Sequence, residues 1–132
     1  MLDRQADALA CCERRSIESL AEGDEQPVRD LFAAFENVLW PVGASKALHL
    51  LATRFFPLWD DEIRKSYGLR GLGRSKHPGR YWAFMAITAV QVLDVGGEAA
   101  LGRNPLKALD EFNYCRLRLK LAELLPKRNP SA

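Results

Sequence analysis

The segment VGASKALHLLATRFFPLWDDEIRKSYG, residues 42–68, decides how this chain folds. Gly43 stands before an apolar stretch of helical period, which predicts a tight glycine turn and then a helix from residue 44 or 45 to about residue 54. A Phe-Phe-Pro turn follows, and Asp60 then opens a further helix that Gly68 ends. The segment therefore predicts two short helices joined by a compact apolar turn.

Helical periodicity continues on both sides of this segment, and we see no strand alternation of useful length. The expected helices lie at residues 5–21, 27–39, 44–54, 60–68, 80–95 and 105–125. Trp40-Pro41 ends the second of these helices, because proline disfavours helical geometry in the residue before it. The fifth helix is apolar nearly all round, which predicts a central buried helix. We expect the first helix to be peripheral and the tail, residues 126–132, to be disordered. The fold class is therefore all-α, a compact single-domain bundle of about six helices over residues 1–132.

Composition places the chain among soluble globular domains. Of its 132 residues 48% are apolar and 27% are charged. Cys11, Cys12 and Cys115 are an odd number with two adjacent, so they form no disulfide framework, and no Cys/His spacing matches a zinc site. We therefore expect reduced thiols and neither a metal nor a cofactor. The charged stretch MLDRQADALACCERRS and the lack of a long apolar run argue against a signal peptide or membrane segment, so we expect a cytoplasmic protein.

The net charge of +2 is unevenly distributed. Residues 64–80 carry basic side chains and no acidic one. The basic side chains are those of Arg64, Lys65, Arg70, Arg74, Lys76 and Arg80. Such a stripe fits the phosphates of a nucleic acid, or it is a solvated loop, and charge alone does not decide between the two.

The turn at Gly43 has a chemistry of its own. In a tight hairpin, the backbone N–H groups of Gly43, Ala44 and Ser45 point outward at the start of a helix, whose dipole favours an anion. Glycine lets the backbone approach a phosphate oxygen closely, and Lys46 adds a positive charge beside it. The alternative is an ordinary corner between two helices that uses glycine only for its turn.

An ordered pattern connects this turn with the aspartate. The pattern consists of Pro41, Gly43, Ala47, Pro57, Asp60 and Ile63. It resembles the helix-hairpin-helix and Gly/Pro-Asp region of the HhH-GPD DNA glycosylases, over about residues 36–70. The chain is also similar to uncharacterised bacterial proteins that combine KALHLL, LWD and LDEFNY, a resemblance that implies no function.

The glycosylase resemblance implies a helix-hairpin-helix element, a role in DNA repair and largely sequence-independent binding of duplex DNA. It also implies that the Asp60 carboxylate activates water or stabilises the cationic sugar that forms as a base leaves. In the bifunctional branch a Schiff-base lysine occupies the position of Ser45, and here Lys46 follows one residue later, about 100° around the helix. The resemblance therefore favours a monofunctional hydrolase of N-glycosidic bonds, or a relative that binds without catalysis.

Each of these residues also has a purely structural interpretation. Asp60 is a good helix N-cap, which serves the fold without any substrate. Trp40, His49 and Trp59 could wall a pocket for a flipped base, but a hydrophobic core needs the same residue types, and His49 fits a satisfied core histidine.

Two further function classes stay open from the sequence. The first is a non-enzymatic helical module that binds another protein or a second copy of itself through its apolar faces. The second is a small-molecule enzyme in which Asp60 shares a pocket with Asp110 or Glu111. These two acids lie in the sequence DEFNY, where consecutive polar residues interrupt an apolar helix, so we expect one or two of the DEFNY residues to face inward.

Overall fold

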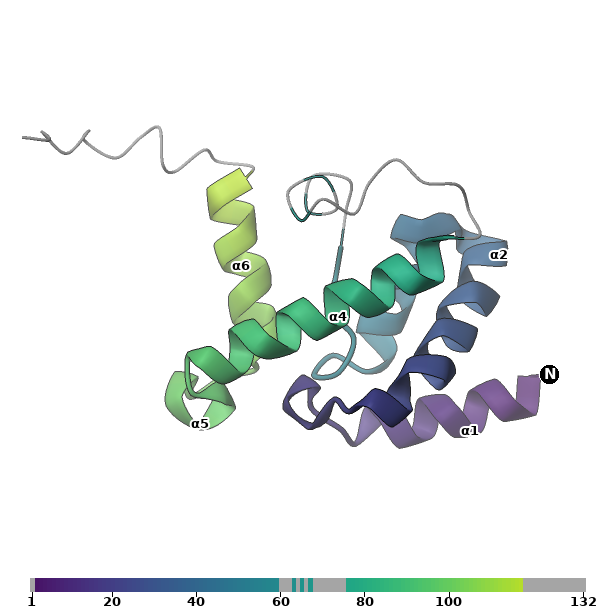
Figure 1. Cartoon of the computed structure of the whole chain (residues 1–132), viewed down its shortest axis with the longest axis horizontal. Helices are drawn as coiled ribbons and strands as arrows, with labels where there is room; N and C mark the ends of the chain where they lie inside the picture. The colour runs from purple at the N-terminus through teal and green to yellow at the C-terminus, as the bar shows by residue number, and fades with distance from the viewer. Residues whose placement is uncertain (1, 60–62, 64, 66, 68–75, 118–132) are drawn as a thin grey trace, which may run out of the picture.

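The structure is a computed structural model that describes residues 2–59, 63, 65, 67 and 76–117. These residues form helices and contain no strand, which confirms the all-α prediction. The helices are α1 (Leu2–Glu13), α2 (Glu25–Leu51), α4 (His77–Asp94), α5 (Gly97–Leu101) and α6 (Pro105–Leu117), with 3-10 turns at Ile17–Ser19 and Glu22–Asp24 (Figure 1). No described helix has the length and apolar character that crossing a membrane requires. Residues 68–75, the tail and most of the helix expected at residues 60–68 lie outside the described residues.

The first helix ends earlier than the sequence predicts. It stops at Glu13, and the chain then turns instead of continuing as a helix to residue 21. The Arg15 guanidinium makes the turn, because it donates to both carboxylate oxygens of Asp24, at 2.6 and 2.8 Å, and to the Ser19 carbonyl at 2.8 Å. These bonds fold residues 14–24 into a compact loop, so the prediction of one helix over residues 5–21 is wrong in its second half.

The longest helix is bent where the sequence predicts a break. Trp40 has φ 62° and ψ 173°, which interrupts α2 and divides it into a first limb, residues 25–39, and a second limb, residues 41–51. The two limbs point in different directions in Figure 1. The second limb begins at Pro41, and Gly43 lies inside its first turn without a positive φ. The chain therefore turns at Trp40 and not at the glycine, so the second limb starts and ends about three residues before its predicted bounds.

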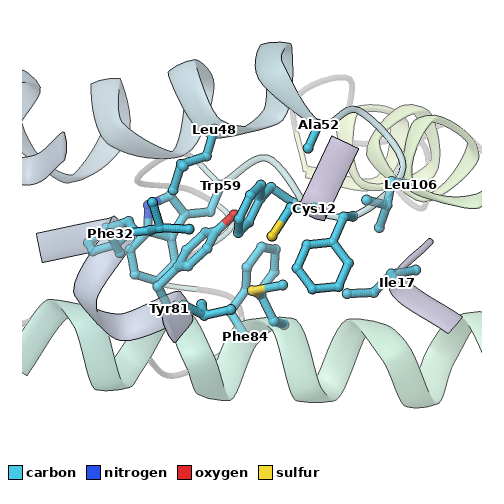
Figure 2. Close-up of a cluster of buried hydrophobic side chains, with 14 of the residues drawn as sticks. Cys12, Ile17, Phe32, Leu48, Ala52, Trp59, Tyr81, Phe84 and Leu106 are labelled. Carbon is cyan, nitrogen blue, oxygen red and sulfur yellow. The ribbon is translucent and has the colours of Figure 1, made fainter. Parts of the chain in front are cut away.

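The core is built around aromatic side chains from α2, from the turn after it and from α4 (Figure 2). Phe32 and Tyr81 stack with ring centroids 4.6 Å apart, and Trp59 packs edge-on against both, at 5.6 and 5.1 Å. Trp59 also contacts Phe84 at 5.8 Å. Aromatic pairs in these geometries stabilise a core beyond the area that they bury. They fix the first limb of α2, the residues before position 60 and α4 against one another.

Helix α4 agrees with its predicted position to within three residues, and Gly96, with φ 91°, follows its end as the Gly-Gly pair predicts. The prediction of a central buried helix is correct for only one of its faces. Its inner face is in the core, but Ile87, Val90 and Leu93 are 38%, 58% and 56% exposed. The described helices pack on one side of α4, so its outer side remains apolar and accessible in this part of the chain.

Helix α6 begins at Pro105 as predicted. One polar residue of DEFNY does face inward, because Asn113 is buried and its amide donates to the Tyr67 hydroxyl at 3.4 Å. The Tyr67 hydroxyl in turn donates to the side-chain carbonyl of Gln91 in α4 at 3.1 Å. These bonds join α6 to α4 through side chains.

Candidate functional site at the Trp40 bend

The turn after the second limb folds back onto the start of that limb. Trp59 is completely buried, and its indole N–H donates to the Pro41 carbonyl at 2.9 Å. The Ser45 hydroxyl donates to the Trp59 carbonyl at 2.9 Å and accepts the Trp59 backbone N–H at 3.3 Å. Three bonds therefore fix Trp59, the residue that precedes Asp60 in the chain, one to Pro41 in the Trp40 bend (residues 39–42) and two to Ser45 just after it.

A buried acid–imidazole pair lies next to the aromatic cluster. Glu36, in the last turn of the first limb, is 2% exposed, and its carboxylate is hydrogen-bonded to the Nδ1 of His77, the first residue of α4. The pair lies one helical turn from the stacked Phe32 and Tyr81 on both helices. The pair ties the bend end of the first limb to the start of α4, because a buried carboxylate needs a charged or hydrogen-bonding partner.

The sequence patterns considered above did not predict either member of this pair. A usable signal existed for Glu36, which follows Phe32 by four residues and so falls on the apolar face of its helix. A carboxylate on a core-facing stripe predicts a buried partner. His77 carried no comparable signal, because its partner is distant in the sequence.

The predicted phosphate-binding residues separate into exposed and buried groups. Lys46 is exposed, whereas Ala44 and Ser45 have no exposed surface, backbone included, so neither their side chains nor their N–H groups are open to a phosphate. Gly43 also has a structural reason to be glycine. A β-carbon there would lie 3.0 Å from the β-carbon of Leu39, so the close approach of the two limbs favours a residue without one.

The three residues proposed as pocket walls have different surroundings. Trp40 is 67% exposed at the bend, whereas Trp59 has no exposed surface and belongs to the core. His49 is half-buried, and its Nδ1 lies 2.8 Å from the Phe56 carbonyl, within the turn that follows the second limb. Of these three residues, Trp40 is therefore the one with a large exposed aromatic surface.

The basic stripe is described at three of its six positions. Lys65 and Lys76 are exposed and Arg80 is half-buried. The other predicted site residues, Asp60, Arg64, Arg70 and Arg74, lie outside the described residues.

The alternative acids of the sequence DEFNY lie on α6. Glu111 is exposed and forms an ion pair with Arg103 at 3.0 Å, and Asp110 is half-buried. Within the part of the chain that the structure describes, no three His, Cys, Asp or Glu side chains gather as a metal site would require.

Two hollows lie away from the bend. The larger, about 460 Å³, is an apolar groove between α4, α5 and α6. Its lining residues are Gln91, Val92, Asp94, Val95, Leu101, Pro105, Ala108, Leu109 and Phe112. We call it the α4–α6 groove.

The smaller hollow, about 230 Å³, lies between α1 and α2 beside Cys11 and Cys12. The Arg15 guanidinium lies over the Phe55 ring at 4.7 Å there. The hydrogen bonds that it donates to Asp24 lower the pKa of that carboxyl, and burial raises the pKa of the Cys12 thiol to about 11.

Comparison with the models of known protein families, with curated proteins and with solved structures gives no match to this chain.

Proposed function

We propose that the protein is a DNA-binding domain that contacts the phosphate backbone of a duplex at the Trp40 bend. The supporting observation is the anchoring of Trp59 to Pro41 and Ser45, which ties the residue before Asp60 to the first turn of the second limb. This is the order of parts in the glycosylase pattern that the sequence resembles: a helix start that accepts a phosphate, followed by a turn that brings a carboxylate beside it.

The chemistry of the bend fits this proposal. The start of a helix carries the positive end of its dipole, which favours an anion. Lys46 is exposed in the second turn of the same limb, and the aromatic ring of Trp40 is exposed at the bend. A lysine strengthens phosphate binding, and an exposed aromatic ring offers a surface on which a base stacks. Asp60 is the candidate carboxylate for base release in this proposal.

Salt dependence of duplex binding tests the proposal. Fluorescence anisotropy with a labelled duplex is expected to show binding at low salt and a steep loss of affinity as salt rises. Lys46→Gln is expected to weaken binding several-fold and to reduce the salt slope by about one. Lys107→Gln, an exposed lysine on α6, is the matched control and leaves affinity unchanged. Absence of wild-type binding at low salt overturns the proposal.

A second experiment separates binding from catalysis. Asp60→Asn is expected to keep duplex affinity, while base release from damaged duplexes falls by roughly 10²-fold or more, because asparagine is not a base. If the wild-type and variant proteins are indistinguishable on a panel of damaged duplexes, Asp60 is a helix cap and the domain binds DNA without this catalysis.

One observation favours a second candidate function, a helical module that binds another protein. The α4–α6 groove is lined almost entirely by apolar side chains, and Phe112 at its edge is 61% exposed. Apolar grooves of this kind accept the apolar face of a partner helix. A fluorescent apolar dye is expected to bind the folded protein and to lose affinity on Leu101→Gln, a groove variant, but not on Leu50→Gln, a substitution elsewhere on the surface.

A further inference from the structure

The outer face of α4 has the repeat of a helix–helix interface. Arg80, Ala83, Ile87, Val90 and Asp94 are spaced three and four residues apart, so they form one stripe along the helix, which we call the outer stripe. Ile87, Val90 and Asp94 are exposed, whereas Arg80 is half-buried and Ala83 is half-buried against the edge of the core. Figure 1 shows α4 as the helix nearest the viewer, running diagonally across the molecule.

The charges on α4 oppose its own dipole. The first turn of α4 contains no acidic residue and the last turn no basic one, whereas Arg80 lies near the start and Asp94 at the end. Residues 81–93 between them carry no charge. A cation near a helix start and an anion at a helix end are both unfavourable, typically by about 0.3–1 kcal/mol each at a surface. If a second copy of the helix packs in the opposite direction, the cation near the start of one helix lies beside the C-terminal end of the other, and the anion at the end of one lies beside the start of the other. Both charges are then stabilised by the neighbouring helix.

The geometry points to a homodimer in which the α4 helices of two copies pack antiparallel along the outer stripe. Arg80 and Asp94 are each seven residues from Ile87, which is roughly 10 Å along the helix axis. A two-fold axis at Ile87 therefore brings Arg80 of each copy to the level of Asp94 in the other. The uncharged stretches of the two stripes meet between these two ion pairs.

A parallel pairing lacks this complementarity, because it places Arg80 against Arg80 and Asp94 against Asp94. A foreign helix would need an uncharged face of the same length with opposite charges at its ends, which a second copy supplies without further assumption. One helix pair buries less than the roughly 800 Å² per partner of a standard interface, so we expect dissociation at protein concentrations on the order of micromolar. The proposal is independent of DNA binding.

Charge exchange tests the pairing. Sedimentation equilibrium over a range of protein concentrations, without DNA, is expected to give a monomer–dimer equilibrium for the wild-type chain. Arg80→Asp and Asp94→Arg are each expected to weaken dimerisation by roughly tenfold or more, because each places like charges together twice per dimer. The double variant, Arg80→Asp with Asp94→Arg, is expected to recover dimerisation, because both ion pairs form again with their signs exchanged.

An apolar variant and two controls complete the test. Ile87→Glu is expected to give a monomer, because it buries a carboxylate at the two-fold axis. Glu111→Lys, on the exposed face of α6, controls for a change of charge elsewhere and keeps the wild-type equilibrium. Circular dichroism checks that each variant is folded before its association is measured. A wild-type chain that stays monomeric at high micromolar concentration overturns the proposal, and so does a folded double variant that fails to recover.

Discussion

Replacing Trp40 by glycine tests whether the bend in α2 is held under strain. Trp40 has φ 62° and ψ 173°, a region that glycine occupies readily and other residues reach at a cost of about 1–3 kcal/mol. Glycine also loses more backbone entropy on folding, about 0.5–1 kcal/mol. Alanine removes the indole but keeps the β-carbon, so it retains the strain. We therefore expect Trp40→Gly to be more stable than Trp40→Ala by roughly 0.5–2 kcal/mol.

Urea denaturation followed by far-ultraviolet circular dichroism measures this difference. The midpoint is expected to be higher for Trp40→Gly than for Trp40→Ala, with equal slopes, because the two variants expose similar surface on unfolding. Both variants lack the indole. If both lose DNA affinity to the same extent, the loss is due to the missing ring and not to a change in the backbone. If Trp40→Ala is as stable as Trp40→Gly, the bend carries no backbone strain and the reasoning fails.

Three further results are expected. Because the pKa of Asp24 is lowered, its ion pair with Arg15 stabilises the fold at pH values above 3.8, the ordinary pKa of this carboxyl, and the stabilisation is lost as pH falls through the lower folded-state pKa. Asp24→Asn is expected to remove this pH dependence from urea midpoints measured across that range. Peptide mapping after brief alkylation at neutral pH is expected to find Cys11 modified and Cys12 protected. Cys12 is buried, and a thiol with a pKa near 11 has about 100-fold less thiolate than an ordinary one. Equal labelling of the two cysteines would contradict the structure. Glu36→Ala is expected to cost about 2–4 kcal/mol, because it leaves a buried imidazole without its carboxylate, and a urea midpoint close to wild type would show that the pair contributes little.

Local chemistry explains the features that the sequence predicted correctly. The helical class follows from apolar spacing, which depends only on neighbours along the chain. Pro41 places the break in α2 because proline restricts the residue before it, and Gly96 ends α4 because it adopts a positive φ at no steric cost. The inward turn of one polar residue in DEFNY also follows from an interrupted apolar stripe, and Asn113 is that residue.

Contacts between distant segments decided the rest. The partnership of Glu36 with His77 and the docking of Trp59 on Pro41 join residues that no local pattern connects. The early end of α1 depends on the reach of Arg15 across a loop. The exposed outer face of α4 could not be predicted for the same reason. An apolar helix buries whichever side its neighbours cover. Its sequence therefore determines that a large apolar surface can be buried, and only the tertiary packing decides which part of that surface remains available to a partner.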